Sequence, residues 1–388
     1  MKLRQLPEDF KVEEINKFEL SSGRNSYKLY LLEKKGIETF SLLGYLSKKN
    51  NIPVSEFGIA GLKDRHAVTK QYFTVPSKYE IKTLRETNFT ITFLGYVSKG
   101  IKLGDLECNK FEITVRDVKK GELQGIAQKS QNIELIGVPN YFDSQRFWSV
   151  ADHQFIAKFL IQKNYEQAVK CFLTKYHKSE GRKTKEEKTA IHQNWGKESL
   201  LRLNVKTPQL ANVLNEYRKR KSWLDAYKRI SPSIREIIVS AYQSYLWNEC
   251  IKKILIKLVN KKKLYSIKYN IGSLLFYKTI ADEELRKIPL TFKTISDQIK
   301  PDSFELEIID KVLGKEGVSV SGFNIKKETG NFFKTHDRLV IVKPKSFRIS
   351  QPLADELNGR GNAFKFVLSF TLPKGSYATV ITKRIFNQ

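Results

Sequence analysis

Hydrophobic periodicity constrains the fold of this chain most, because its two ends have the spacing of strands and its middle has that of helices. Residues 111–116 alternate apolar and polar side chains, and residues 366–372 repeat this alternation near the C-terminus. From about Asp152 to Asn260, apolar residues recur at helical intervals. The pattern predicts an α+β protein in which the first and last parts of the chain contribute to one sheet.

Individual elements can be predicted inside these regions. Lys28–Leu32 is a short, largely apolar run suited to a strand, and Thr39–Lys49 has helical spacing. The longest predicted helix is Ser233–Val259, with Ser233 and Glu236 in the arrangement of a capping box. Its apolar stripe should face the core. The polar run Lys178–Lys188 is most simply a solvated loop, with RNA contact as the lesser alternative.

The charge of the chain indicates a polyanionic partner. The 388 residues include 69 Lys and Arg against 41 Asp and Glu, a formal net charge of +28. Such an excess attracts nucleic acid, although a lysine-rich composition alone can also produce it. The aromatic content of 12% adds to the argument, since unstacked bases are commonly held on aromatic rings.

Cysteine usage and hydropathy indicate the cellular compartment of the protein. Cys108, Cys171 and Cys250 lie far apart, without the spacing of a metal site or a disulfide framework. No apolar run is long enough to span a membrane, and the first residues lack the apolar stretch of a signal peptide. We therefore expect a cytoplasmic protein without membrane contact, of a length that allows two domains or one domain with an insertion.

The segment GLKDRHAVTKQYF, residues 61–73, carries the candidate chemistry. It places Asp64 beside Lys63, Arg65 and His66, on a connection between two apolar, strand-like runs. Nearby cations keep a carboxylate ionised, and an ionised carboxylate can act as a nucleophile or base. The alternative is a solvated turn, since charged residues and a glycine are typical of turns. His66 as the general base is a weaker alternative.

This segment resembles the signature of the TruD family of pseudouridine synthases. Further segments resemble the family in the same order along the chain: PEDFKVEE near the start, KLGDLECNKFEITVR from Lys102, VPNYFDSQRF from Val138 and LPKGSYATV from Leu372. In the family the aspartate of the signature is the catalytic residue, so the resemblance implies that Asp64 is catalytic here.

The resemblance also implies the residues that bind the substrate. Phe10 of PEDF, Asn140 of NYF and Tyr377 of the C-terminal motif correspond to residues at the family's substrate site. Phe142 and Lys63 are further candidates, and Arg4 is a candidate for phosphate contact.

The chain departs from the family at two glycine positions, which Asp143 and Trp148 occupy. Glycine there would permit a positive φ or a close backbone approach.

The architecture and activity follow from the same resemblance. It implies a catalytic domain of sheet and helices, residues 1–154 and 346–388, interrupted by an inserted α/β domain, residues 155–345. The family's two lobes form a V whose concave surface takes RNA. The implied activity is isomerisation of uridine 13 in tRNA by a monomer that uses no cofactor and no metal. A non-catalytic RNA-binding or RNA-chaperoning protein on the same scaffold is the main alternative, and a basic nuclease ranks behind both.

Overall fold

The computed structural model describes residues 1–177, 180–359 and 362–386. Contacts divide the chain into two compact units: unit 1 is Met1–Val138 with Val342–Gln388, and unit 2 is Pro139–Ile341. The chain crosses between them at β9 (Val138–Pro139) and β14 (Ile341–Val342). The insertion predicted from the sequence, residues 155–345, begins later than unit 2 and ends slightly after it.

Unit 1 is built on an 11-stranded sheet whose main order is β15-β17-β8-β2-β5-β3-β7-β6. Three short strands flank this order, because β1 pairs with β8, β16 with β17 and β4 with β5. β2 and β5 run parallel, whereas β3–β5, β2–β8 and β8–β17 are antiparallel. The strands are β1 (Lys2–Leu3), β2 (Phe10–Ile15), β3 (Tyr27–Lys35), β4 (Gly58–Ile59), β5 (Val68–Pro76), β6 (Leu84–Arg85), β7 (Phe89–Val97), β8 (Cys108–Lys119), β15 (Lys345–Ile349), β16 (Leu353–Ala354) and β17 (Ala363–Pro373).

The pairing of β8 with β17 joins the beginning and the end of the chain in one sheet, which confirms the prediction from their shared alternation. Phe111 lies opposite Phe370, and Ile113 lies opposite Leu368. All four side chains are at most 6% exposed. Apolar side chains of both strands therefore cover the same buried face, as a period of two requires.

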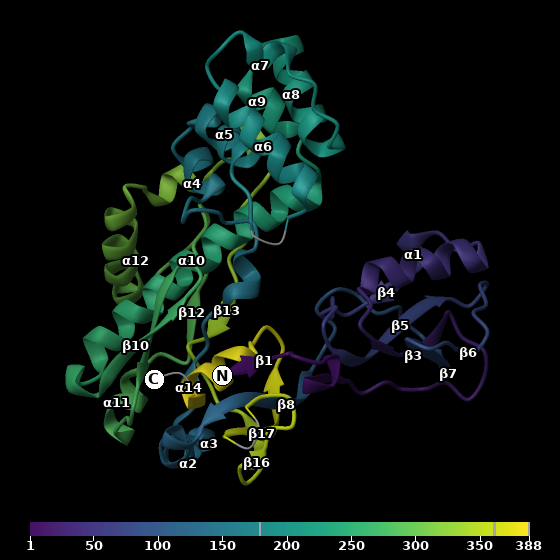
Figure 1. Cartoon of the computed structure of the whole chain (residues 1–388), viewed down its shortest axis with the longest axis vertical. Coiled ribbons are helices and arrows are strands. Elements are labelled where there is room, and N and C mark those ends of the chain that lie inside the picture. Colours follow the sequence, from purple (N-terminus) through teal and green to yellow (C-terminus); the bar gives the residue numbers. More distant parts are fainter. Residues whose placement is uncertain (178–179, 360–361, 387–388) are drawn as a thin grey trace. The chain divides into compact units, whose positions relative to one another are not determined.

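Helix α1 (Thr39–Asn50) covers part of this sheet, as Figure 1 shows beside β4 and β5. Its Leu42, Leu43 and Leu46 join a core cluster with Tyr30 of β3 and Phe73 of β5. The predicted strand Lys28–Leu32 and the predicted helix Thr39–Lys49 are both confirmed. The remaining helices of unit 1 are α2 (Leu123–Ser130), α3 (Ile133–Ile136) and α14 (Ala378–Phe386).

Unit 2 is mainly helical, and its longest element is α10 (Pro232–Leu258). Ile238, Ala241 and Leu246 of the predicted stripe are buried, and so are Tyr242 and Trp247 on neighbouring positions. The helix is thus enclosed on more than one side. The other elements are α4 (Ile156–Ile161), α5 (Tyr165–Thr174), α6 (Arg182–Asn194), α7 (Ser199–Arg202), α8 (Pro208–Arg220), α9 (Trp223–Lys228), β10 (Leu264–Tyr269), β11 (Gly272–Tyr277), α11 (Asp282–Lys287), β12 (Thr291–Lys293), α12 (Ser303–Glu316), α13 (Lys326–Thr329) and β13 (Asp337–Leu339). The α+β class is confirmed.

The start of α10 differs from its prediction. The N-cap is Ser231, Pro232 is the first helical residue, and no side-chain capping bond forms. The capping box predicted at Ser233 and Glu236 is therefore wrong. Proline explains the earlier start, because it has no N–H to leave unsatisfied and its φ already suits a helix.

The predicted solvated loop Lys178–Lys188 is also wrong over most of its length, because α6 begins at Arg182. Residues 178 and 179 lie outside the described residues. Arg182 and Glu186 form an i,i+4 ion pair with a 2.7 Å separation. Lys188, 8% exposed, donates to the carbonyl of Lys175 at 2.8 Å. A run of charged residues thus still forms a helix here, because the side of α6 that faces the protein is anchored to the rest of unit 2.

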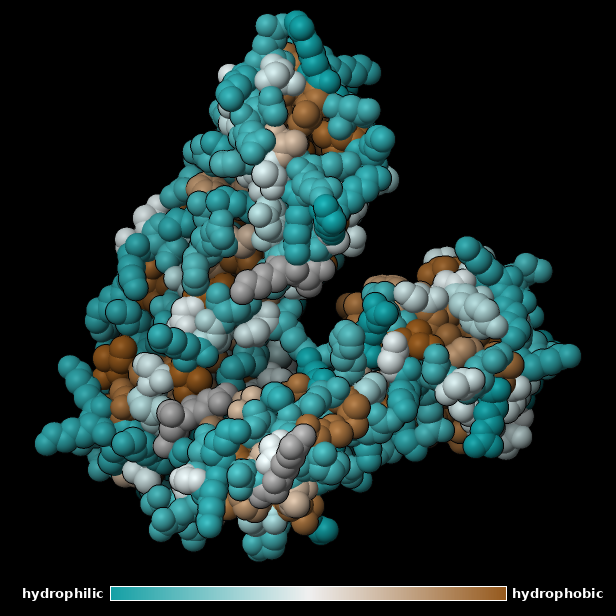
Figure 2. All heavy atoms as spheres, in the orientation of Figure 1, coloured by the Kyte–Doolittle hydropathy of each residue, from teal (hydrophilic) through white to brown (hydrophobic). Residues whose placement is uncertain are grey.

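The faces of both units that are visible in Figure 2 are mostly hydrophilic, with apolar residues scattered between charged ones. This distribution agrees with the high content of Lys and Arg.

Candidate active site

Asp64 lies on the irregular connection between β4 and β5, as its sequence context predicts. Its side chain is 23% exposed, and Oδ2 lies 2.7 Å from Nη1 of Arg4. Oδ1 accepts a hydrogen bond from the backbone N–H of His66 at 3.0 Å. The carboxylate is therefore oriented by two groups and still reaches solvent, where a substrate could meet it.

Arg4 reaches Asp64 from a sharp bend between β1 and β2. Its φ is 58°, a left-handed value that is uncommon outside glycine. The guanidinium carbon lies 4.1 Å from the centroid of the Phe10 ring, within cation–π range. Phe10 is 4% exposed and opens β2, whose parallel pairing with β5 sets Lys11 opposite Val68. Three predicted site residues, Arg4, Phe10 and Asp64, thus come together within unit 1.

Lys63 directs its ammonium towards the sheet. Its Nζ lies 2.8 Å from Oε1 of Glu14 and donates to Oδ1 of Asn109 at 2.9 Å. The Lys63 and Glu14 side chains are only 8% and 0% exposed. These contacts anchor the Asp64 connection to β2 and β8, and a contact between Lys63 and the substrate stays a prediction.

The cation that pairs with Asp64 comes from a part of the chain that local sequence does not indicate. The motif offered Lys63, Arg65 and His66 as charged neighbours, whereas the ion pair is made by Arg4. The side chains of Arg65 and His66 are exposed. The role of His66 visible here is its backbone N–H, which orients the carboxylate.

A buried polar layer lies beneath the connection and was not predicted. Lys34 of β3, 2% exposed, donates to the carbonyls of Ile37 at 2.8 Å and Asp64 at 3.1 Å. The hydroxyl of Thr39 donates to Oε1 of Gln71 at 3.1 Å, and the backbone N–H of Lys63 donates to that hydroxyl at 3.3 Å. Side chains of β3, α1 and β5 therefore fix the main chain that carries Asp64.

Lys34 should make the stability of the protein depend on pH. Burial lowers the pKa of Lys34 to about 8, although the charge of Asp64 opposes this shift. At pH values between this folded pKa and the pKa of Lys34 in the unfolded chain, the unfolded chain binds more protons than the folded one. The unfolding free energy therefore rises with pH from about 8 towards the unfolded pKa of about 10.4, and it is lost again as pH falls back to about 8. Relative to Lys34→Met, the wild type should gain on the order of 2 kcal/mol of unfolding free energy between about pH 8 and about pH 10.

Urea unfolding at a series of pH values measures this difference, with Lys70→Met as the matched control. Lys70 lies on β5, and its hydrogen bond with Glu33 raises the pKa of Lys70. Relative to Lys70→Met, the wild type should gain no unfolding free energy between about pH 8 and about pH 10. Parallel pH curves for the wild type and Lys34→Met would contradict the expectation.

Asn140 lies in unit 2, directly after β9, and is 3% exposed. Its Nδ2 donates to the carbonyl of Leu339, and its Oδ1 accepts from Nη2 of Arg338, both at 3.1 Å. An amide has two N–H groups and two oxygen lone pairs. The uracil contact predicted for Asn140 would use the donor and acceptor positions left by these two bonds.

Phe142, also in unit 2, is 7% exposed and packed among other residues of that unit. Its ring lies 4.0 Å from the guanidinium carbon of Arg338 and 5.7 Å from the Trp247 ring, edge-on at 88°. Its backbone N–H and C=O both bond the side-chain amide of Asn248 at 2.9 Å. These contacts are those of a core residue, and a substrate contact of Phe142 stays a prediction.

The two positions that differ from the family's glycines adopt ordinary backbone angles. Asp143 has φ −104° and caps a short 3₁₀ helix, Ser144–Phe147, by accepting from Ser144 N at 2.7 Å. Trp148 has φ −64° and a side chain that is 50% exposed. Neither position requires the freedom of glycine.

Tyr377 immediately precedes α14 and is half-buried. Its carbonyl accepts from Val380 N at 3.0 Å, which closes the first turn of that helix. Gly375, in the turn between β17 and α14, has φ 78°, a left-handed value that a side chain would strain. This glycine of the C-terminal motif thus lets the chain turn from the last strand to Tyr377.

In the described ranges, no three His, Cys, Asp or Glu side chains are grouped so that they could bind a metal ion. Among the helices of those ranges, none combines the length and hydropathy required of a membrane span.

Comparisons with known proteins bear on the whole chain. A family model described as tRNA pseudouridine synthase D (TruD) matches residues 1–266 and 285–385. A Methanocaldococcus jannaschii protein named "Probable tRNA pseudouridine synthase D 2" is 43% identical over 393 residues, covering 100% of this chain and 92% of the relative. The tRNA pseudouridine synthase D of Aquifex aeolicus is 30% identical, with coverage of 100% and 98%.

A solved structure shows the same fold. The crystal structure of a Methanosarcina mazei protein described as TruD matches with a TM-score of 0.72 and 24% identity. The match covers 100% of this chain and 93% of that protein.

Proposed function

Because the chain belongs to the TruD family of tRNA pseudouridine synthases, we propose that it converts uridine 13 of tRNA to pseudouridine, with Asp64 as the catalytic residue. The observation that carries this proposal is the Asp64 carboxylate, paired with Arg4 at 2.7 Å and partly open to solvent. It lies in the segment by which the sequence most resembles the family. Position 13 is inferred from the resemblance to bacterial TruD.

The reaction is an isomerisation, and its atoms balance without another reactant. The bond between ribose C1′ and uracil N1 breaks, and a bond between C1′ and C5 forms. C5 loses a proton and N1 gains one, so no electron is transferred overall. Asp64 either attacks C1′ as N1 leaves or removes the C2′ proton, and the carboxylate is regenerated at the end. Chemistry of this balance requires neither a cofactor nor a metal.

The side chains around Asp64 support this chemistry by orientation. Arg4 and the His66 N–H each bond one oxygen of the Asp64 carboxylate, so that the carboxylate is already oriented for reaction. The uridine must leave its stack to reach Asp64. We assign Phe10 to the apolar wall of the site. The resemblance to the family further assigns Asn140 and Tyr377 to the binding of the base.

The proposed substrate agrees with the charge of the protein. The net charge of +28 would draw a tRNA, and binding should weaken steeply with added salt. We assign unit 1, which carries Asp64, to the catalytic domain, and unit 2 to the inserted domain of the family.

A turnover assay on tRNA transcripts tests both the activity and the position. The wild-type protein should form one pseudouridine in a transcript with U13 and none in a matched transcript with C13. Site-specific detection by carbodiimide adducts and primer extension reads the position directly. Equal pseudouridine formation in both transcripts would disprove position 13.

The alternative, a non-catalytic RNA-binding protein, makes a different prediction in cells. Cells that lack this protein should lose pseudouridine at one tRNA position if the protein is an enzyme. Retention of every pseudouridine would support the non-catalytic alternative.

A further inference from the structure

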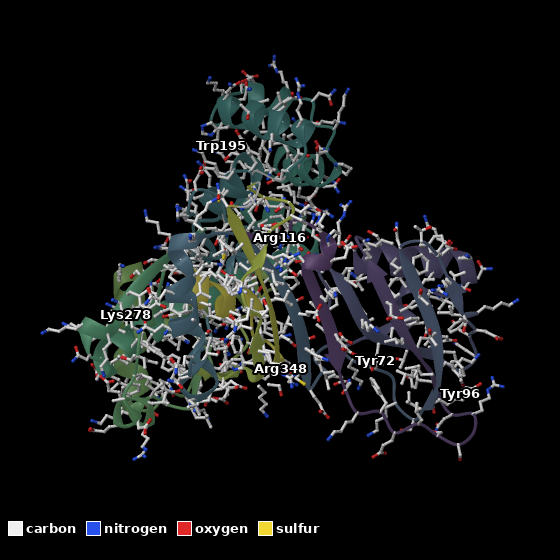
Figure 3. All side chains as sticks on the ribbon, turned by 60° about the horizontal axis from the view of Figure 1, so that its bottom comes forward. Tyr72, Tyr96, Arg116, Trp195, Lys278 and Arg348 are labelled. Atoms are coloured by element: carbon white, nitrogen blue, oxygen red, sulfur yellow. The ribbon has the colours of Figure 1, made fainter. Side chains whose placement is uncertain are left out.

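A buried cluster of charged side chains lies behind the N-terminal segment of unit 1, centred on Arg116 of β8. The guanidinium bonds three carboxylates: Nε lies 2.9 Å from Asp9 Oδ1, and Nη1 lies 3.1 Å from both Asp355 Oδ1 and Glu356 Oε1. Arg116, Asp9 and Asp355 are 5%, 1% and 4% exposed. Figure 3 labels Arg116 where the purple N-terminal segment approaches the yellow C-terminal strand. One buried cation therefore joins β8 to the N-terminal segment, through Asp9, and to a segment before β17, through Asp355 and Glu356.

Residues 4–9 form a loop that leaves and rejoins the same strand edge. Leu3 of β1 lies opposite Val115, and Phe10 of β2 lies opposite Ile113, so both ends of the loop pair with neighbouring positions of β8. The loop begins at the positive φ of Arg4, the residue that pairs with Asp64. The position of the Arg4 guanidinium thus depends on how this loop is held.

Asp9 closes the loop from inside. Its Oδ2 accepts from the backbone N–H of Leu6 at 2.8 Å, and its own N–H donates to the carbonyl of Leu6 at 3.1 Å. Its other oxygen, Oδ1, is the one that bonds Arg116. Asp9 therefore shapes the turn Pro7–Asp9 and ties it to β8 at the same time.

We propose that Asp9 and Arg116 are positioning residues, which hold residues 4–9 so that Arg4 meets Asp64 and covers the ring of Phe10. The catalytic part of this inference rests on the proposed function. Neither residue touches Asp64 in the contacts above, so both act through Arg4.

The second arm of the cluster provides a matched control. Asp355 accepts from the backbone N–H groups of Asp117 at 2.8 Å and Leu357 at 3.1 Å, and from Asn358 Nδ2 at 2.9 Å. Although burial opposes it, these bonds and Arg116 hold the pKa of Asp355 at about 2. Asp355 thus bonds the same arginine as Asp9, but its link to residues 4–9 is indirect: it runs through Asn358, whose Nδ2 also bonds Gln5 Oε1 at 2.8 Å.

Hydrogen exchange in the free protein tests the positioning role without any substrate. Asp9→Asn should speed exchange of the backbone amides of Leu6 and Asp9 by at least about tenfold, because the hydrogen bonds that protect these two N–H groups depend on the Asp9 anchor. Asp355→Asn should leave the exchange of those amides within about threefold of the wild type. Unchanged exchange in Asp9→Asn, or an equal increase in both variants, would overturn the inference.

Kinetics test the link to Asp64. Asp9→Asn should lower kcat by roughly 10-fold to 10²-fold, with the KM for tRNA within about threefold, because a misplaced group costs the chemical step. In an Arg4→Met background, Asp9→Asn should lower kcat by less than about threefold, since the group it positions is gone. The catalytic part would be overturned if the effects of Asp9→Asn and Arg4→Met on kcat multiplied in the double variant, or if Asp9→Asn alone left kcat unchanged. A wild-type protein that forms no pseudouridine would count against the proposed function, and the exchange result would stand independently.

Discussion

Replacing Asp64 by asparagine should lower kcat for pseudouridine formation by at least about 10³-fold, because the proposed nucleophile or base is removed. The amide keeps the size of the side chain and can still accept from the His66 N–H that bonds Oδ1 at 3.0 Å. Affinity for tRNA should therefore change by less than about threefold. Single-turnover assays on a U13 transcript, together with filter binding, separate the two quantities.

Asp105→Asn is the matched control for this substitution. Asp105 is an exposed aspartate of unit 1 that caps a turn through Lys102 N at 2.8 Å. Its kcat should stay within about twofold of the wild type, as is usual for surface substitutions. Full activity of Asp64→Asn and Asp64→Ala would refute the assignment of Asp64.

The fold was largely predictable where one buried face imposed a period on the sequence. The alternating apolar residues of β8 and β17 indicated two strands that share a buried face, and they are paired. The spacing in α10 likewise indicated a long helix, correct to within a residue at each end. The first half of α6, residues 182–188, was not predicted, because its run of charged residues lacks apolar periodicity. The helix forms there nevertheless, and Lys188 anchors it to the carbonyl of Lys175.

The candidate site was predictable in part. Asp64 was indicated by the motif around it, but Arg4 as its partner was not, since that contact depends on a left-handed bend and on the parallel β2–β5 pairing. The buried position of Lys34 was also predictable from the sequence. Lys34 shares a strand face with Tyr30 and Leu32, and that alternation places it inside the protein. Tertiary pairing therefore determines which charges meet, beyond what motif spacing can indicate.

Arg4→Met should lower kcat by roughly 10²-fold, because Asp64 loses the cation that orients its Oδ2. Arg4→Lys should recover part of this loss, since it restores a charge but not the planar group that lies over Phe10. The sequence suggested instead that Arg4 contacts phosphate, and the two roles differ in a measurable way. A lost phosphate contact weakens binding and reduces the slope of log K against log salt concentration by about 0.9.

The contacts of Arg4 favour the first role, because its guanidinium is held between the Asp64 carboxylate and the Phe10 ring, and its side chain is only 21% exposed. We therefore expect Arg4→Met to leave the salt slope of tRNA binding unchanged while kcat falls. Arg24→Met, which removes an exposed arginine of unit 1, serves as the control and should keep kcat within about twofold. A reduced slope with an unchanged kcat would show that Arg4 binds phosphate and that Asp64 acts without it.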